Sequence, residues 1–232
     1  MPERVERLAV VVPAYRAAGT VAAVVTGIGA AAPGSRVYVV DDGSDDGTGG
    51  AAAAAGATVL THARNAGKGS ALATGIARAL ADGANFLVTL DADGQHPPEA
   101  IPAVVAPVSS GRADLVIGCR RREGAMPYPR RLSNWLSTAL AARIGGQPML
   151  DSQSGFRAFT RALAAAVRPA ERRYDYETAF LLGALAAGFR ATAVPIPTIY
   201  GGAPSHFNHV ADTWRVARVY ARYGWRLLRG GR

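Results

Sequence analysis

Two carboxylates one residue apart, Asp91 and Asp93, follow an apolar run that has the composition of a buried strand. A turn that contains Gly94 and two prolines comes directly after them. In open α/β sheets, ligands bind beyond the carboxyl ends of the strands, where side chains leave the core. Asp91, Asp93 and the amide oxygen of Gln95 could therefore share Mg²⁺ or Mn²⁺, hard ions that prefer oxygen ligands. The alternative is a solvated turn whose aspartates cap a helix that begins near Pro98.

A second predicted strand, over residues 36–40, also ends in acidic residues. Asp41 and Asp42 follow it directly and begin a turn rich in Asp, Gly and Ser. Such aspartates commonly cap the backbone of their own turn. At a strand end they are also candidates for ligand binding. The pattern of an apolar strand followed by carboxylates therefore occurs twice in the chain.

The elements that must position these residues alternate between strands and helices. Short apolar runs rich in β-branched residues predict strands over residues 8–12, 36–40, 58–61, 85–90 and 114–118. Helices are expected over residues 20–31, 50–55 and 98–106, and from the turn 65–69 to about residue 81. This alternation predicts an α/β fold whose parallel sheet is covered by helices on both faces.

The pattern changes after Gly118. The sequence predicts, in order, a basic segment at 120–131, a helix at 132–144, a polar turn at 151–157, a helix at 176–187, a strand at 191–194 and a basic helix at about 210–228. No internal repeat is visible, so a repeat architecture is not expected.

The composition limits the partners that the chain can have. With 232 residues, of which 49% are hydrophobic, it suits one large domain or a domain with a tail. The formal net charge of +9 and the pI near 10.4 favour an anionic partner: a nucleic acid, a phosphorylated substrate or a membrane surface. Aromatic and basic residues interleave only near the C-terminus, so we do not expect nucleic-acid binding.

The cysteine count and the hydropathy pattern indicate where the chain works. The single cysteine, Cys119, rules out an internal disulfide and fits a reducing compartment or indifference to redox. No charge-free apolar run approaches the ~18 residues of a transmembrane helix, and residues 1–7 lack the apolar core of a signal peptide. We therefore expect a cytoplasmic protein, either soluble or peripheral on the cytoplasmic face of a membrane.

Three nucleotide-binding patterns are excluded or weakened by spacing. A phosphate loop needs Ser or Thr directly after its lysine and a glycine five places before its second glycine, where this chain has Gly69 and His62. The dinucleotide fingerprint fails because its third glycine would be Leu72. A sugar nucleotidyltransferase would need a glycine-rich basic loop after the first strand, and residues 16–20 supply only a thin version of it.

Five motifs, each at or near the end of a predicted strand or at a turn, resemble those of the family 2 glycosyltransferases of GT-A fold. They are Pro13-Ala14-Tyr15, Asp41-Asp42-Gly43-Ser44, Gly67-Lys68-Gly69, Asp91-Ala92-Asp93-Gly94-Gln95-His96-Pro97-Pro98 and Ser154-Gly155-Phe156-Arg157. The resemblance covers nearly the whole chain and is greatest to the dolichyl-phosphate mannose synthase and polyprenyl-phosphate glycosyltransferase branch. It implies a Rossmann-like, mostly parallel sheet. It also implies metal-dependent, inverting transfer of a hexose from a nucleoside-diphosphate sugar, of GDP-mannose or UDP-glucose type, to polyprenyl or dolichyl phosphate.

The resemblance assigns the nucleoside site to the first two motifs. Pro13, Ala14 and Tyr15 would line the base pocket, and Asp42 would accept a hydrogen bond from the base with support from Asp41. Family members commonly carry an acidic residue two places after the tyrosine, whereas Arg16, Ala17 and Ala18 follow it here. The choice between UDP and GDP therefore stays open.

The resemblance assigns the diphosphate and metal sites to the next two motifs. Asp91 and Ala92 would lie near the ribose and diphosphate, and Asp93 and Gln95 would ligate Mg²⁺ or Mn²⁺ together with Asp91. The metal would act as a Lewis acid on the leaving diphosphate. Lys68 would approach the diphosphate, unless it is simply a solvated lysine. The catalytic residues implied by the family pattern are Asp93, Asp151 and Arg157.

The basic segment after Cys119 resembles the acceptor-phosphate site of the same branch. Its candidate residues are Arg120, Arg130, Arg131 and Ser133, and guanidinium groups suit phosphate oxygens. A phosphate monoester has a second pKa of about 6, so it is already a nucleophile at neutral pH. The alternative for this segment is a solvated basic loop.

A hydroxyl acceptor is the alternative within the family, and it would require a general base. Asp151, Asp175 and Glu177 are the available carboxylates. The resemblance puts Asp151 near the transferred sugar, while the other two could instead position the helix that begins near Tyr176.

The chain is expected to comprise a catalytic domain over residues 1–208 and a basic amphipathic helix over residues 209–232. From Trp214 onward, apolar and aromatic residues recur at helical spacing, with arginines between them. This pattern fits an interfacial helix on an anionic membrane. Docking of the apolar stripe on the catalytic domain explains the same pattern, and an integral membrane partner is a further alternative.

Overall fold

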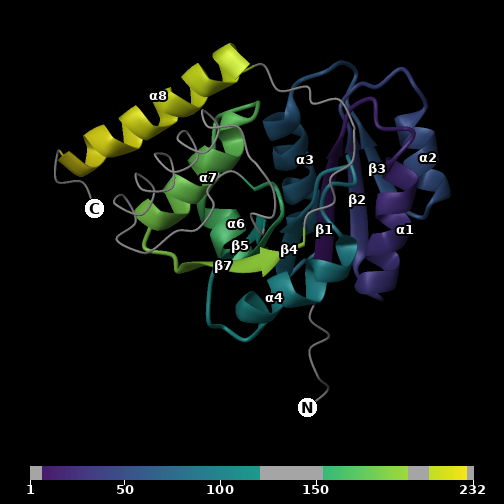
Figure 1. The fold of residues 1–232 in the computed structure, drawn as a ribbon, viewed down its shortest axis with the longest axis horizontal. Helices are drawn as coiled ribbons and strands as arrows, with labels where there is room; N and C mark the ends of the chain where they lie inside the picture. The colour runs from purple at the N-terminus through teal and green to yellow at the C-terminus, as the bar shows by residue number, and fades with distance from the viewer. Residues whose placement is uncertain (1–6, 121–153, 198–208, 229–232) are drawn as a thin grey trace.

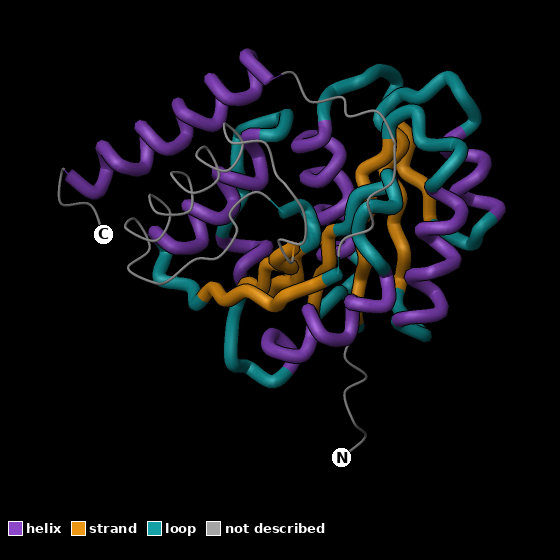
Figure 2. Tube along the Cα trace, in the orientation of Figure 1, coloured by secondary structure: helices purple, strands orange, loops and turns teal. Residues whose placement is uncertain are grey.

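The computed structural model of the chain describes residues 7–120, 154–197 and 209–228 (Figures 1 and 2). Within these ranges, a seven-stranded sheet of order β3-β2-β1-β4-β6-β5-β7 forms the centre, with helices on both faces. The strands are β1 (Leu8–Ala14), β2 (Arg36–Asp41), β3 (Thr58–Thr61), β4 (Phe86–Thr89), β5 (Leu115–Arg120), β6 (Arg157–Thr160) and β7 (Ala191–Ile196). The expected α/β fold with a mostly parallel sheet is confirmed.

The first four strands in sequence are parallel and bring both acidic strand ends to one edge. β1 pairs with β2 and with β4, and in this register Ala14 lies beside Asp41 and Val11 beside Thr89. The backbone N–H of Asp42 continues the ladder by donating to the carbonyl of Ala14 at 2.8 Å. We call this side of the sheet the carboxyl edge.

Strand β6 departs from the parallel pattern and was not predicted. It runs antiparallel between β4 and β5, and its first residue, Arg157, pairs with both Thr89 and Ile117. The sequence predicted a turn at this residue, which is wrong. A run of only four residues that begins with a charged side chain gives little strand signal. Pairing with β4 on one side and β5 on the other stabilises the strand instead.

The helices agree with the prediction apart from their ends and one addition. They are α1 (Val21–Ala31), α2 (Thr48–Ala54), α3 (Lys68–Ala81), α4 (Ile101–Ser109), α6 (Arg161–Ala166), α7 (Asp175–Ala186) and α8 (His209–Leu228). A 3₁₀ turn at Pro98–Ala100 leads into α4, and the short helix α6 was not predicted. The helix expected over 132–144 lies outside the described residues.

The sheet separates two apolar cores. Val11 of β1 points toward the core that holds α3, α6, α7 and part of α8. Val10 and Val12 point the other way, toward α1 and α4. All three valines are fully buried, as expected for a strand that is covered on both faces. This double burial fixes the register of the strand ends that carry the acidic residues.

The C-terminal helix α8 lies along α7, at the end of the molecule away from α1 and α2 (Figure 1). Val219 and Tyr220 belong to the same core as α3 and α7. The hydroxyl of Tyr223 donates to the carbonyl of Ala179 in α7 at 3.4 Å. The apolar stripe is therefore docked on α7. None of the helices in the described ranges has the length and apolar composition of a membrane-spanning segment.

Candidate functional site

Asp42 fastens the loop that leads into α3. Its carboxylate is buried, and Oδ1 lies 2.6 Å from Nδ1 of His62 and accepts from the backbone N–H of Ala66 at 2.9 Å. Oδ2 accepts from the N–H of Gly67 at 2.7 Å. These contacts determine where α3 begins, and hence where its first residue, Lys68, is held.

Gly67 and Gly69 allow the start of α3 to approach the segment before α7. Gly67 has a φ of +101°, and a Cβ added there would lie 2.5 Å from the carbonyl oxygen of Arg172. A Cβ on Gly69 would meet Cβ of Tyr176 at 2.6 Å. Ser70 donates its N–H to the carbonyl of Arg172 at 3.1 Å, so the two segments are joined directly. The glycines of the third motif are required by this close packing.

Lys68 bridges two carboxylates that come from different elements. Its Nζ lies 2.7 Å from Oδ1 of Asp91, just after β4, and 3.2 Å from Oε1 of Glu177 in α7. Lys68 is the only lysine of the chain. Burial alone would lower the pKa of its ammonium, but Asp91 and Glu177 outweigh burial and raise the pKa above its ordinary value. We call these three residues the carboxyl-edge cluster.

Gly155 packs directly against the two carboxylates of this cluster. A Cβ at Gly155 would lie 2.7 Å from Oδ2 of Asp91 and 3.0 Å from Oε1 of Glu177. The hydroxyl of Thr89 donates to the carbonyl of Gly155 at 2.8 Å. The absence of a side chain at this position is therefore what allows β4, α7 and the segment before β6 to meet.

Arg157 lies beneath this arrangement, with only 2% of its surface exposed. Its Nε donates to the carbonyl of Ser154 at 2.9 Å, and its Nη1 donates to the carbonyl of Glu177 at 2.5 Å. The guanidinium therefore supports the backbone on both sides of the cluster. Arg157, which the sequence predicted as catalytic, thus lies at the site, where its guanidinium supports the backbone.

The turn after β4 holds the remaining predicted metal ligands. Oδ1 of Asp93 accepts from the backbone N–H of Gln95 at 2.9 Å, and the hydroxyl of Thr20 donates to the carbonyl of Ala92 at 2.6 Å. Within the described ranges, no group of three or more His, Cys, Asp or Glu residues is arranged to hold a metal. The oxygen donors of Asp91, Asp93 and Gln95 nonetheless suit Mg²⁺ or Mn²⁺ chemically.

The predicted nucleoside residues lie on the neighbouring strand ends. Pro13 and Ala14 close β1 beside Asp41 of β2, whose Oδ1 accepts from the N–H of Ser44 at 3.0 Å. The guanidinium of Arg16 lies 5.5 Å from the centre of the Tyr15 ring. The first, second and fourth motifs thus meet at the carboxyl edge.

The acceptor residues are only partly covered by the structure. Arg120 ends β5, where its backbone pairs with Ile196 of β7. The predicted residues Asp151, Arg130, Arg131 and Ser133 lie outside the described residues.

Glu177 is the residue that the sequence undervalued. The sequence predicts for it only the role of a base for the alternative acceptor or a place at a helix start, because an acidic residue in the first turn of a helix is common. Its side chain is 10% exposed and belongs to the carboxyl-edge cluster. Its sequence signal is weak, since only the fold brings it to Lys68.

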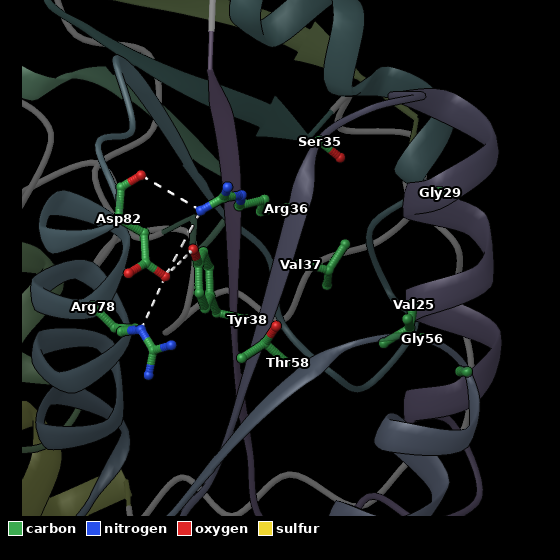
Figure 3. Close-up of a pocket in the computed structure, with 11 residues that line it drawn as sticks. Val25, Gly29, Ser35, Arg36, Val37, Tyr38, Gly56, Thr58, Arg78 and Asp82 are labelled. Atoms are coloured by element: carbon green, nitrogen blue, oxygen red, sulfur yellow. Dashed lines mark hydrogen bonds and ion pairs between the residues drawn. The ribbon is translucent and has the colours of Figure 1, made fainter.

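A hollow of ≈ 460 Å³ lies at the opposite end of the sheet (Figure 3). Its lining includes Arg36 and Tyr38 at the amino end of β2, and Arg78 and Asp82 at the end of α3. None of the predicted site residues that the structure describes lies there.

The chain is similar in sequence to glycosyltransferases. The glycosyl transferase family 2 model matches residues 9–168. An uncharacterized protein of Methanocaldococcus jannaschii is 37% identical over 171 residues, which cover 71% of this chain and 70% of that protein. Undecaprenyl-phosphate mannosyltransferase of Micrococcus luteus is 30% identical over 202 residues, which cover 82% of each chain.

The fold is also shared with a solved glycosyltransferase. The crystal structure of glucosyl-3-phosphoglycerate synthase from Mycobacterium tuberculosis in complex with Mg²⁺ and UDP superposes with a TM-score of 0.76 and 24% identity. The match covers 94% of this chain and 79% of that chain. Because the family match spans more than half of the sequence and the fold agrees, this chain belongs to glycosyl transferase family 2 and is a glycosyltransferase.

Proposed function

We propose that this glycosyltransferase moves a hexose, with inversion, from a nucleoside-diphosphate sugar to a polyprenyl phosphate. The observation that carries the proposal is the meeting of Asp41, Asp42 and the Lys68–Asp91 ion pair at one sheet edge. This edge is where open α/β sheets bind their ligands. The similarity to undecaprenyl-phosphate mannosyltransferase supports the lipid-phosphate acceptor.

Lys68 is suited to receive the diphosphate of the donor. The two neighbouring carboxylates keep its ammonium charged although it is largely buried. An anion that enters beside it competes with Asp91 for an ammonium that has already lost most of its water. We expect the diphosphate to bind Lys68 while Glu177 continues to hold it.

The oxygen donors of Asp91, Asp93 and Gln95 would hold Mg²⁺ or Mn²⁺. When bound, the ion supplies positive charge that stabilises the diphosphate as it leaves. The similarity in fold to a structure solved with Mg²⁺ and UDP is consistent with this assignment. Pro13, Ala14, Tyr15 and Asp42 would surround the base.

The acceptor phosphate would bind Arg120, Arg130, Arg131 and Ser133. A phosphate that is already ionised attacks the sugar without a general base. The lipid chain requires that the enzyme work at a membrane, either through its own basic surface or through an integral partner. We place it on the cytoplasmic face.

Calorimetry with UDP and GDP tests the donor site. We expect the diphosphate to bind only in the presence of Mg²⁺ or Mn²⁺. In Asp93→Asn this metal dependence should be abolished, so that adding the metal no longer increases binding. Asp82→Asn is the matched control, because it removes a carboxylate at the other end of the sheet. Equal binding in chelator and in metal would overturn the proposal. A panel of UDP- and GDP-sugars then identifies the donor.

A hydroxyl acceptor is the second candidate, and the position of Glu177 favours it. Its carboxylate lies beside Lys68 at the carboxyl edge, where a general base could act. The assay offers polyprenyl phosphate and free sugars side by side. With the phosphate acceptor, we expect Glu177→Gln to reduce turnover by about tenfold through misplaced Lys68. Product formed only with sugars, together with loss of that product in Glu177→Gln, would establish the hydroxyl acceptor instead.

A further inference from the structure

The helix α8 has two opposite sides that differ in their surroundings. On one side, Val219 and Tyr220 are 3% and 6% exposed and pack against α7. On the other side, Trp214 and Trp225 are 69% and 56% exposed. Within the described ranges these are the large apolar side chains that face solvent. The apolar stripe that the sequence suggested for a membrane therefore packs against α7, and a different face of the helix is exposed.

The two tryptophans share one face of the helix. They are 11 positions apart in the sequence, and at about 3.6 residues per turn this spacing brings them back to the same side. At about 1.5 Å per residue they stand roughly 16 Å apart along the axis. Val219 and Tyr220 lie five and six positions after Trp214, on the far side.

Basic side chains accompany the exposed tryptophans. Arg218 is one turn after Trp214 on the exposed side. Arg215 lies on the flank of this face, and so does Arg222, which pairs with Glu171 of the catalytic fold. Two copies of α8 packed face to face would bring like charges together, so a second copy of this chain fits poorly. Tryptophan with arginine instead suits the boundary between lipid headgroups and acyl chains.

We propose that the face of α8 defined by Trp214, Arg218 and Trp225 rests on an anionic lipid bilayer. The docked stripe holds the helix against α7, so the two tryptophans enter the interface from a rigid support. Arg218 meets the anionic headgroups. This inference rests on the proposed function, because a polyprenyl phosphate presents its phosphate at the headgroup level.

Flotation of the full chain with protein-free vesicles tests the proposal. The vesicles contain either phosphatidylcholine alone or phosphatidylcholine with phosphatidylglycerol, at low and high salt. We expect binding to the anionic vesicles at low salt. The double variant Trp214→Ser/Trp225→Ser should bind roughly tenfold more weakly, since two large apolar groups no longer enter the lipid. Arg218→Gln should bind anionic vesicles about fivefold more weakly, and its binding to phosphatidylcholine vesicles should be unchanged.

Two variants serve as controls. Arg36→Gln removes the same charge from an exposed arginine at the amino end of β2 and should leave vesicle binding unchanged. Trp214→Phe should retain most of the binding. Because nucleotide binding by the double variant is measured separately by calorimetry, loss of vesicle binding is distinguished from failure of the proposed function.

Three results would overturn the proposal. The double variant could float as well as the original chain. Binding could occur only with membranes that retain their proteins, which would indicate an integral partner. Light scattering could show a dimer that disappears in the double variant without any vesicle binding, which would indicate a second copy.

Discussion

The two ends of the sheet each carry a cluster of charged groups, and the clusters differ in burial. The amino-edge cluster consists of Arg36, Tyr38, Arg78 and Asp82 (Figure 3). Oδ2 of Asp82 accepts from the hydroxyl of Tyr38 at 2.7 Å and from Nε of Arg78 at 2.9 Å. The side chains of Arg36 and Arg78 are 62% and 47% exposed. Water therefore screens this cluster from most sides.

The carboxyl-edge cluster has similar chemical groups, but its charged side chains are less exposed. Lys68 is 17% exposed, and Glu177 is 10% exposed. Two carboxylates share one ammonium, and the missing side chain of Gly155 lets them come close. A buried charge that loses its partner costs far more than an exposed one. Burial, more than the number of ion pairs, therefore distinguishes the candidate site from an ordinary surface network.

The largest effect is expected from Lys68→Met. This change leaves Asp91 and Glu177 facing each other without a cation, and breaking a buried pair in this way costs about 3–5 kcal/mol. The free energy of unfolding, measured in urea, should fall by that amount. Adding Glu177→Gln should restore part of it, because one of the two uncompensated charges is removed. A loss below about 1 kcal/mol would show that the cluster is screened like the amino edge.

Gly155→Ala is expected to have the next largest effect. The new Cβ would lie 2.7 Å from Oδ2 of Asp91, and crowding of this kind costs about 1–3 kcal/mol. Transferase activity should fall more than stability, since the carboxylates must move apart. Gly50→Ala in α2 is the matched control, because its Cβ meets nothing within 4 Å. It should keep full activity and gain roughly 0.5–1 kcal/mol of stability. Full activity in Gly155→Ala would contradict the close approach.

The smallest effect is expected from Asp82→Asn. Hydrogen bonds from Tyr38 and then Arg78 lower the pKa of Asp82 below its ordinary value. Its contribution to stability is therefore present above the pKa of the unfolded chain, and it is lost as the pH falls through the folded pKa. Thermal unfolding measured as a function of pH should show that the variant loses slightly less stability than the original chain as the pH falls. At neutral pH, activity should stay within about twofold of the original. A large loss of activity would make the hollow a functional site.

Local patterns predicted the parallel half of the fold. Apolar runs that end in Asp41 and Asp91 indicated buried strands with charged ends, and parallel pairing brings such ends to one edge. The glycines beside Lys68 indicate a loop there, because glycine marks tight turns and close approaches. These features follow from a few consecutive residues, so the sequence alone was sufficient for them.

The sequence by itself determined the strand–helix order as far as β5, the acidic strand ends and the amphipathic pattern of α8. Only the tertiary structure decided that Arg157 begins an antiparallel strand, that Glu177 joins Asp91 at Lys68, and which side of α8 faces outward. A periodic pattern reports which face of an element is apolar, because this depends on neighbours in sequence. It does not report which element covers that face or which distant charge compensates a buried one, because these depend on how the whole chain packs.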